Sequence, residues 1–411
     1  TFSILGWPAN AAVDEAGNRV KTGDLALFHP TDLLETGRDL IFFWVARMVL
    51  MAAYALGEVP FRDVYMHGMV LDDQGRKMSK SLGNIVDPFE YIPAFGTDAV
   101  RLSLVLGTAP GQDSKSSPAK IETMRNFTNK LWNVARFILS STAKEADVPM
   151  PEARTLADRW ILARCAETAA NVTKLVETYQ LPLASELLRD FVWSDLADWY
   201  LEIAKVEKEG KDRLLRWLLK RVLVLLHPVM PFVTEAIWQE AGWGGVLALA
   251  DWPETATAID EEALRAFAAL RALVTDGRRL RSEAKLDPAK KLPFALVASD
   301  VDWALVEANA AWIGRLLQAS GMERAESLPA EALSIPSGAL LVGIIQQAAS
   351  AEDRARLEAE LADAERYLAD VERRLANAEF VAKAPERVVN DLRQKLVETQ
   401  EKRERLKTQL A

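Results

Sequence analysis

Hydrophobic and polar positions change their period along the chain, and the first zone mixes two periods. Val64 to Leu71 is a short apolar run typical of a buried strand, whereas Asp39 to Ala55 has the one-sided apolar pattern of a helix. Asp98 to Leu106 predicts a further helix, led by an acidic residue near its N-terminal end. A Gly- and Ser-rich stretch, 107–118, then predicts a linker. Residues 1–118 therefore predict an α/β domain.

From about Ala119 to Asp260 the apolar residues recur at helical spacing, and no run is typical of a strand. The predicted helices are Ile121–Leu139, Leu156–Tyr179, Leu183–Lys208, Leu214–Leu226 and Phe232–Ala241. Six tryptophans occur here among Leu and Val: Trp132, Trp160, Trp193, Trp199, Trp217 and Trp238. Tryptophan stacks well on nucleic-acid bases, but at this spacing it is more often core. Residues 119–260 therefore predict an all-α bundle.

Residues 261–350 mix both periods again. A helix, Glu261 to Arg281, precedes a short strand at Leu292–Val297, a helix from Val301 to Ser320 and a second apolar run at Ala339–Ile345. This order predicts a small α+β unit. A basic string through the zone is either a solvated helix face or a phosphate-facing patch; it consists of Arg271, Arg278, Arg279, Arg281, Lys285, Lys290 and Lys291.

The last zone, 351–411, has apolar residues at alternating spacings of four and three, the seam of a coiled coil. The first arm runs through Leu357, Leu361, Ala364, Leu368, Val371 and Leu375, and the second from Val389 to Leu410. The break between them, Asn377 to Pro385, contains a proline. Two heptad arms joined by such a break predict an antiparallel helical hairpin, so the whole chain is expected to be multidomain.

Composition fits a soluble protein of roughly two to four domains. Half of the 411 residues are hydrophobic and 27% are charged, with a net charge of −9, which argues weakly against a chain coated in nucleic acid but leaves local basic patches open. No apolar stretch is uninterrupted enough to cross a bilayer, since Arg47 breaks the run from Leu40 to Leu56. We also find no signal peptide, and we expect no membrane contact.

The few cysteines and histidines limit the chemistry further. Cys165 is the only cysteine, which excludes disulfides within the chain and indicates a reducing, cytoplasmic setting. His29, His67 and His227 lie far apart without partners at metal-ligand spacing, so we expect no protein-bound metal. The chain begins at Thr1 without methionine, and we expect it to be a piece of a longer protein.

Lys77 and Lys80 are the strongest candidates for chemistry. They lie in Gly75–Asn84 (the lysine loop), where glycine and serine indicate a mobile segment, and two ammonium groups suit a polyphosphate. The loop lies between the predicted strand and a helical run after Asp87-Pro88, and nucleotides bind at such junctions in α/β units. A solvated basic turn is the alternative interpretation of this loop.

Other catalytic and phosphate-binding motifs are not found in the sequence. The chain contains neither G-x-x-x-x-G-K-[ST] nor a G-x-G-x-x-G after a strand, and no Ser-His-Asp or Cys-His set is evident.

The segment Lys77-Met78-Ser79-Lys80-Ser81 resembles the signature loop of class I aminoacyl-tRNA synthetases at every position. Further segments resemble the valyl-tRNA synthetases, and the similarity runs from Thr1 to the end of the chain. These segments are 36–48, 60–68, 125–133 and the hairpin turn 377–385, of which the last is the most discriminating because isoleucyl and leucyl relatives lack this hairpin.

This resemblance implies an ATP site formed by His67, Gly68, Lys77, Met78, Ser79 and Lys80. Lys77 and Lys80 would be catalytic contacts to the phosphates, with Lys80 on the departing pyrophosphate, where preorganised cations stabilise developing charge. His67 and Gly68 would lie by the adenosine, and the backbone of Met78 would support the adenine.

The resemblance also implies an amino-acid site. Asp39 would hold the valine ammonium, and Leu40 and Trp44 would wall the side-chain pocket. An N-cap is the alternative for Asp39. Arg38 departs from the family pattern, which usually has another residue type at this position.

The implied architecture has four parts. Residues 1–118 would be the second half of a Rossmann-like catalytic domain, 119–260 an anticodon-binding helical bundle, 261–350 a small α+β linker domain and 351–411 a coiled-coil arm that binds tRNA. The implied reaction is ATP-dependent activation of valine, with Mg²⁺ bound to the ATP, followed by transfer to the 3′ end of tRNA(Val). We expect a monomer.

Two features of the family are missing: the H-x-G-H-type motif, since no histidine has that context, and the inserted editing domain. We therefore expect the chain alone to bind tRNA without forming valyl-adenylate. A non-catalytic tRNA-binding module and an isoleucyl-type synthetase are the alternatives.

Overall fold

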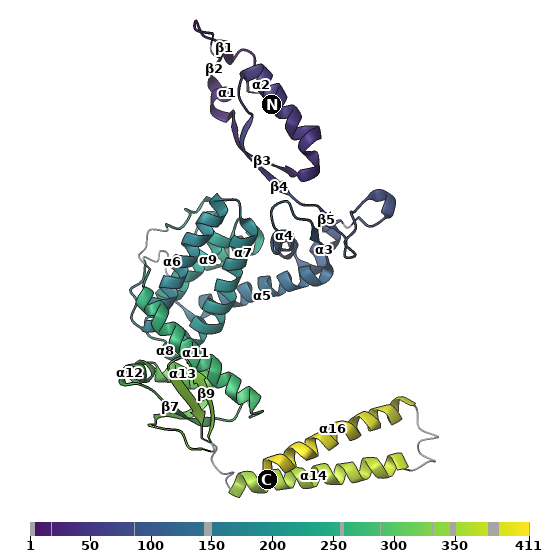
Figure 1. Ribbon diagram of the computed structural model, residues 1–411, viewed down its shortest axis with the longest axis vertical. Helices are drawn as coiled ribbons and strands as arrows, with labels where there is room; N and C mark the ends of the chain where they lie inside the picture. The colour runs from purple at the N-terminus through teal and green to yellow at the C-terminus, as the bar shows by residue number, and fades with distance from the viewer. Residues whose placement is uncertain are drawn as a thin grey trace. The chain divides into compact units, whose positions relative to one another are not determined.

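The computed structural model describes residues 5–17, 19–85, 87–143, 150–254, 259–287, 289–330, 332–345, 351–376 and 386–410. Figure 1 traces the helices and strands along the chain, which divides into two compact units. The first comprises Thr1–Thr275 and Asp300–Leu317, and the second Asp276–Ser299 and Gln318–Ala411.

The first unit begins with small α/β elements, among which β3 and β4 form a parallel pair. They are joined by a helical connection that starts with a 3₁₀ turn and a π-helical turn before α2. Their bounds are β3 Thr31–Gly37, η1 Arg38–Leu40, η2 Ile41–Val45, α2 Ala46–Leu56 and β4 Phe61–His67. The predicted helix over Asp39–Ala55 is thus confirmed in extent, while β3 was not predicted. Before this pair lie β1 Ala11–Val13, β2 Arg19–Lys21 and α1 Gly23–Phe28, with β1 and β2 antiparallel.

The prediction of one strand from Val64 to Leu71 is wrong. The strand β4 ends at His67, and a separate strand, β5 (Val70–Leu71), pairs in parallel with β6 (Ser114–Lys115) inside the expected linker. Gly68 explains the break, because a Cβ there would lie 1.7 Å from the Gln112 carbonyl oxygen. The backbone of a distant loop therefore takes the space that a side chain would need.

Helices dominate the rest of the first unit, as the spacing predicts, and no strand occurs among its described residues between 119 and 260. Their bounds are α3 Pro88–Phe95, α4 Thr97–Val105, α5 Pro118–Ser141, α6 Leu156–Glu177, α7 Leu181–Asp190, η4 Phe191–Tyr200, α8 Leu201–Glu207, α9 Lys211–Leu226, α10 Pro231–Ala241 and η5 Leu247–Leu249. The helix α11, Glu261–Glu283, begins in the first unit and ends in the second. Ser117 caps α5, and a capping box of Thr155 and Asp158 starts α6.

The predicted helix from Leu183 to Lys208 contains a π-helical segment, η4, between α7 and α8. A π turn changes the angular step between residues, so it shifts the face on which later side chains fall.

Burial of the tryptophans follows the core prediction only in part. Trp160, Trp199 and Trp238 are buried, but Trp132 and Trp193 are 41% and 37% exposed.

The second unit contains a four-stranded sheet in the order β8-β7-β10-β9, in which β7 and β8 are parallel and the other pairs antiparallel. Their bounds are β7 Leu292–Val297, β8 Ala319–Arg324, β9 Leu333–Ser337 and β10 Leu340–Ile344. The strands β7 and β10 were predicted, whereas the edge strands β8 and β9 were not, because edge strands lack a continuous apolar run. The predicted helix over Val301–Ser320 is divided into α12 Asp300–Ala308 and α13 Ala310–Leu317, which belong to the first unit, and its last residues fall in β8 of the second unit.

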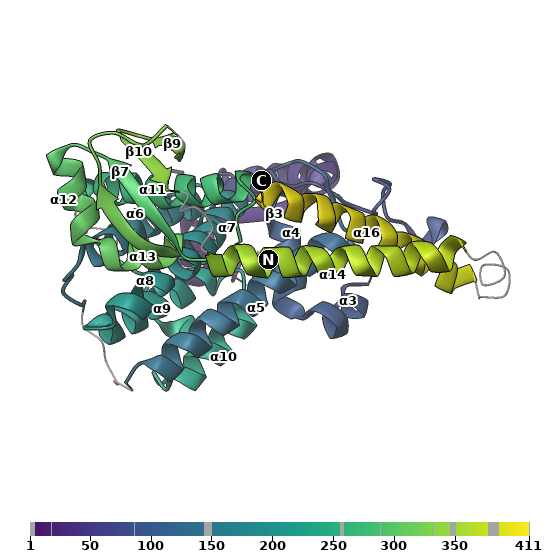
Figure 2. The same cartoon turned by 90° about the horizontal axis from the view of Figure 1, so that it is seen from below.

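Two long helices complete the second unit, α14 (Ala351–Ala376) and α16 (Glu386–Leu410). They lie alongside each other, as Figure 2 shows. The seam residues Ala364, Leu368 and Val371 are buried between otherwise charged faces. The predicted turn, Asn377 to Pro385, lies outside the described residues.

One described helical segment, Arg38–Leu56, has the length and apolar composition that a membrane span would need, even though Arg47 interrupts it. A single helix of this kind is weak evidence for a span, because core helices of soluble proteins pass the same test.

Candidate nucleotide site

Asp72, directly after β5, anchors the lysine loop. Its Oδ1 accepts the backbone N–H groups of Gln74 (3.1 Å) and Arg76 (2.7 Å). Its Oδ2 accepts from the Arg76 Nε (2.8 Å) and the Asn84 Nδ2 (2.9 Å). These donors, with the Asn84 amide as the largest cause, lower the pKa of Asp72 to about 2. The carboxylate thus stays charged and holds both ends of the loop.

Asn84 closes the loop from the other side. Its Oδ1 accepts the Ser79 N–H (2.9 Å), and its Nδ2 also donates to the Lys77 carbonyl (3.2 Å). Ser79 Oγ in turn accepts the Leu82 N–H (3.3 Å) and starts the short turn η3, Lys80–Leu82. The glycines and serines suggested mobility, but side-chain bonds hold the backbone here. The roles of Asp72 and Asn84 were missed, although an acid at a strand end is a usable signal.

The loop brings Lys77 towards the end of β3. Its Nζ lies 3.9 Å from Asp39 Oδ2, and the two side chains are 66% and 54% exposed. An ion pair this open contributes little to stability, roughly 0.2–1 kcal/mol. Lys80 is exposed, and within the described part of the chain no ion pair involves its ammonium. Both cations are therefore available to an anion.

The parallel register sets His67 beside Gly37 at the carboxyl ends of β3 and β4. His67 Nε2 lies 3.4 Å from Glu35 Oε1, and Nδ1 lies 2.8 Å from the Gly68 carbonyl oxygen. Any Cβ at Gly37 would lie 2.8 Å from Asp39 Oδ1, so a side chain there would displace the carboxylate. Three candidate residues, Asp39, His67 and Gly68, thus gather where ligands bind in parallel sheets.

Arg38 joins this edge to the loop before β6. Its guanidinium donates to the Gly111 carbonyl (3.1 Å) and to Asp113 Oδ2 (3.0 Å). Asp113 Oδ1 also accepts the Met69 N–H (2.8 Å). The residue that departs from the family pattern therefore has a structural partner. Asp113 is a further site residue that sequence reasoning missed, since nothing local links it to Arg38.

The other candidates lie near the site without enclosing it. Leu40 and Trp44 are 40% and 48% exposed, and neighbouring aromatic side chains of η2, Phe42 and Phe43, are exposed further. Met78 and Ser79 are half-buried in the loop. No cluster of three or more His, Cys, Asp or Glu that could hold a metal ion is found among the described residues. The geometry suits an anionic ligand reached by lysines, beside a carboxylate that can hold a cation.

Three family models match parts of the chain. The family model "tRNA synthetases class I (I, L, M and V)" matches residues 2–117, "Anticodon-binding domain of tRNA ligase" matches 158–296, and "Valyl tRNA synthetase tRNA binding arm" matches 350–411. A solved LeuRS–tRNA–LeuAMS complex from Agrobacterium radiobacter K84 is similar with a TM-score of 0.49 and 23% identity, over 57% of this chain and 29% of that chain.

The valine–tRNA ligase of Carboxydothermus hydrogenoformans is 39% identical over 96% of this chain and 45% of its own length. That of Geobacillus stearothermophilus is 38% identical over 100% of this chain and 47% of its own length. The chain thus spans about half the length of the curated relatives it matches. The family models and these relatives assign the chain to the class I aminoacyl-tRNA synthetases. Within that class, the chain belongs to the valine–tRNA ligase family.

Proposed function

We propose that this chain is the part of a valine–tRNA ligase that supplies the lysine loop and the tRNA-binding surfaces. The whole enzyme would activate valine with ATP and transfer it to the 3′ end of tRNA(Val). The observation that carries the proposal is the approach of Lys77 Nζ to Asp39 Oδ2, 3.9 Å, which sets a phosphate-binding cation beside an ammonium-binding anion. Valyl-adenylate formation needs a cation at the ATP phosphates and an anion at the valine ammonium, close enough for the two substrates to react.

In the activation step, a valine carboxylate oxygen attacks the α-phosphorus of ATP. The bond from that phosphorus to the bridging oxygen breaks, and pyrophosphate leaves with the charge. Lys77 and Lys80 would neutralise this charge as it develops, which accelerates the step more than equal binding of substrate would. The hydrogen bonds of Asp72 and Asn84 support this role, because they fix the loop before ATP arrives.

The roles proposed for the remaining site residues agree with their positions at the ends of β3 and β4 and in the lysine loop. His67 and Gly68 would lie against the adenosine, and Met78 and Ser79 would complete the loop side of the ATP site. Asp39 would bind the valine ammonium, and Leu40 and Trp44 would line its side-chain pocket. Mg²⁺ would arrive on the ATP phosphates, because it keeps most of its water and binds through few protein ligands.

The exposed apolar surface after β3 supports a larger catalytic domain. Phe42, Phe43 and Tyr54 are 83%, 68% and 82% exposed, and a two-stranded parallel sheet normally has both faces covered. We propose that residues 1–118 form half of a Rossmann-like domain completed by other parts of the enzyme.

We propose that residues 119–260 form the anticodon-binding bundle, 261–350 a linker domain and 351–411 a coiled-coil arm on the tRNA. The matched bundle and arm models support these roles. The arm favours the valyl over the isoleucyl enzyme, since its description names the valyl synthetases. We further propose a cytoplasmic, monomeric enzyme.

Pyrophosphate exchange with ATP tests the proposal. The chain alone should give no valine-dependent exchange and should bind a valine tRNA transcript. Addition of the portion of the Geobacillus stearothermophilus relative that this chain does not cover should restore exchange and aminoacylation. Tight tRNA binding with no exchange in the mixture would instead favour a non-catalytic binding module. Exchange driven by isoleucine rather than valine would overturn the substrate.

A further inference from the structure

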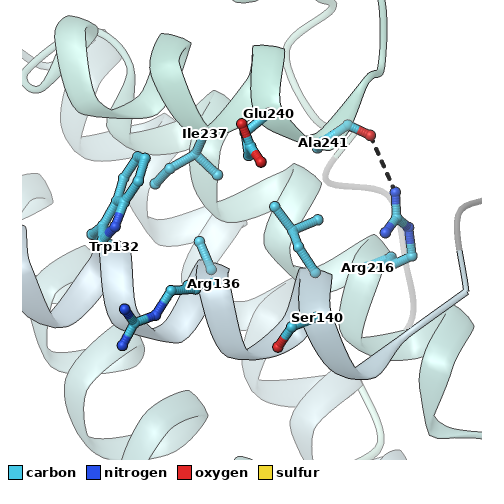
Figure 3. A pocket seen from close by; sticks show the side chains of 9 residues that line it. Trp132, Arg136, Ser140, Arg216, Ile237, Glu240 and Ala241 are labelled. Atoms are coloured by element: carbon cyan, nitrogen blue, oxygen red, sulfur yellow. Dashed lines mark hydrogen bonds between the residues drawn. The ribbon is translucent and has the colours of Figure 1, made fainter.

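Arginine side chains connect separate segments of the first unit at two places. In the helical bundle, Arg216 of α9 donates to the Ala241 carbonyl at the end of α10 (3.3 Å), beside a cavity of about 340 Å³, as the dashed line in Figure 3 shows. This arginine is 2% exposed and joins two helices of the bundle. The second, Arg38, has a side chain that is 47% exposed, and it lies next to Asp39 directly after β3. Its contacts therefore bear on the proposed catalytic site.

That site is assembled from two separate pairs of strands. Asp39 follows β3, which pairs with β4, whereas the lysine loop follows β5, which pairs with β6. The two pairs belong to different sheets, so the ladders within these sheets do not fix the distance between Asp39 and Lys77. The contacts that join one pair to the other therefore set the approach of Lys77 Nζ to Asp39 Oδ2, 3.9 Å.

Asp113 joins the two pairs with both of its carboxylate oxygens. Its Oδ2 accepts from the Arg38 guanidinium (3.0 Å), and its Oδ1 accepts the Met69 N–H (2.8 Å) directly before β5. The other arm of the same guanidinium donates to the Gly111 carbonyl (3.1 Å). A guanidinium fork with two acceptors restricts direction as well as distance, so these bonds orient the turn from which Arg38 projects.

Backbone contacts hold the segment 111–113 independently of Arg38. The Gly111 N–H donates to the Met66 carbonyl of β4 (2.8 Å), and the Gln112 carbonyl oxygen lies where it would be 1.7 Å from a Cβ at Gly68. The segment is therefore a fixed support beside the start of β5. The bonds of Arg38 connect this support to η1, the turn that carries Asp39.

We propose that Arg38 and Asp113 are positioning residues for the activation of valine, because their ion pair orients the Asp39 carboxylate towards the lysine loop. Asp39 then presents valine with its carboxylate oxygen in line with the α-phosphorus of the ATP on the loop. Alignment of two bound reactants accelerates their reaction without tightening the binding of either one. The inference rests on the proposed function and adds two residues that set the geometry between the halves of the site.

The approach of Asp39 to Lys77 can be measured in the chain alone, without any activity. A carbodiimide activates a carboxylate, and an amine in contact with it then displaces the urea and forms an amide. Peptide mass spectrometry should find the Asp39–Lys77 cross-link in the wild type. Arg38→Ala and Asp113→Asn should each lower its yield several-fold, because η1 is no longer held to the segment 111–113.

Pyrophosphate exchange in the mixture that supplies the rest of the enzyme is the second measurement. Arg38→Ala should lower kcat about tenfold and change the KM for valine and for ATP by less than about twofold, since alignment rather than binding is lost. The loss is smaller than the roughly hundredfold cost of a displacement of about 1 Å, because backbone contacts still hold the segment 111–113. Asp113→Asn should behave alike, and Arg38→Lys, which keeps one donor, should recover part of the rate.

Arg62→Ala is the matched control. Arg62 pairs with Asp32 (3.6 Å) on the same two strands, but at their amino ends, so its loss should change neither the cross-link nor kcat. Absence of the cross-link from the wild type, or an unchanged yield or unchanged kcat in Arg38→Ala, would overturn the proposal. A raised KM for ATP in Arg38→Ala, with no effect of Asp113→Asn, would also overturn it, because Arg38 would then bind the phosphates itself.

Failure of the proposed function gives a different result. A wild-type chain that forms the cross-link but gives no exchange in the mixture would refute the proposed function. The cross-link yields of the variants would still decide whether the ion pair orients Asp39.

Discussion

The carboxylate of Asp98 on α4 accepts a hydrogen bond of 2.5 Å from the backbone N–H of Val233, in the first turn of α10 and 135 residues further along the chain. Its other oxygen accepts from the Phe232 N–H (3.3 Å). Arg101, one turn later on α4, donates to the Pro228 and Val229 carbonyls just before α10. The helix α4, which comes after α3 on the C-terminal side of the lysine loop, is thus fixed to the bundle by polar contacts to unsatisfied backbone groups at a helix start.

Asp98 predicts a pH dependence of stability. Burial is the largest cause that raises the pKa of this carboxyl above its ordinary value of 3.8. Its contribution to stability is therefore complete below pH 3.8 and is lost as pH rises through the higher pKa of the folded state. We expect Asp98→Asn to lack this loss. Urea unfolding followed by tryptophan fluorescence between pH 4 and 7 would show this difference between the wild type and the variant. Unfolding midpoints that change with pH in the same way in both proteins would contradict the prediction.

The pH dependence of stability that Asp72 contributes has the opposite sign. Because its pKa is lowered to about 2, its contribution is present above pH 3.8 and is lost as pH falls through the folded value. At neutral pH, Asp72→Asn should release the lysine loop, and trypsin should cut after Arg76, Lys77 and Lys80 several-fold faster. Asp73→Asn is the control, because the neighbouring exposed carboxylate anchors nothing in the described structure. Equal cutting rates for both variants would show that Asp72 does not order the loop.

Lys211 predicts a large loss of stability. Its ammonium, 2% exposed, lies 2.5 Å from Asp158 Oδ1, contacts Glu207 and donates to Thr155 Oγ1 at the start of α6. Lys211→Met leaves the buried Asp158 carboxylate without its cation, which costs about 3–5 kcal/mol. Lys174→Met, on the exposed side of α6, should change stability by less than about 0.5 kcal/mol. Calorimetric unfolding of both variants would check this, and similar small shifts would refute it.

Arg38 and Asp113 should be energetically coupled through Met69. Loss of either side chain should speed hydrogen exchange at the Met69 amide, which Asp113 accepts. The double variant Arg38→Ala/Asp113→Ala should be no faster than Asp113→Ala alone. The coupling should be about 0.2–1 kcal/mol, since the Arg38 side chain is 47% exposed. Additive effects would mean that the two residues act independently.

Lys80 should act on chemistry rather than on tRNA binding. In the mixture that restores exchange, Lys80→Ala should slow pyrophosphate exchange about a hundredfold, the usual order for removing one preorganised donor to developing charge. Its tRNA affinity should not change. Lys174→Ala, an exposed lysine on α6 outside the proposed site, is the control. Weaker tRNA binding with normal exchange would assign Lys80 to the RNA instead.

Three of the seven residues of the basic string in residues 271–291 are now explained by internal contacts. Arg271 Nη1 contacts Asp195 Oδ1 (2.8 Å), and Arg279 Nη2 contacts Asp276 Oδ1 (3.1 Å). Arg281 is buried and donates to the carbonyls of Asp287 (2.8 Å) and Lys290 (2.6 Å). Arg279 and Arg281 therefore hold their own segment together, whereas Arg271 joins α11 to η4. Sequence alone left this open, because a run of charges does not reveal which of them have partners.

Secondary structure and motifs could be predicted from the sequence wherever neighbouring residues determine them. The helical period between Ala119 and Asp260, the heptads of α14 and α16 and the Gly–Ser frame of the lysine loop all reside in neighbouring residues. The motif around Lys77 and Lys80 also needs no fold to be read, because its residue types and spacing carry the chemistry. For this reason the class of protein and the position of the loop follow from the sequence by itself.

Tertiary structure alone decided which distant groups meet. The break at Gly68 depends on the backbone of Gln112, the order of the loop on Asp72 and Asn84, and the exposure of Trp132 on the packing of α5 against α9 and α10. Each is a contact between segments whose separation in sequence carries no periodic signal. Periodicity reports which face of an element is apolar, but only packing determines whether that face is covered and by what.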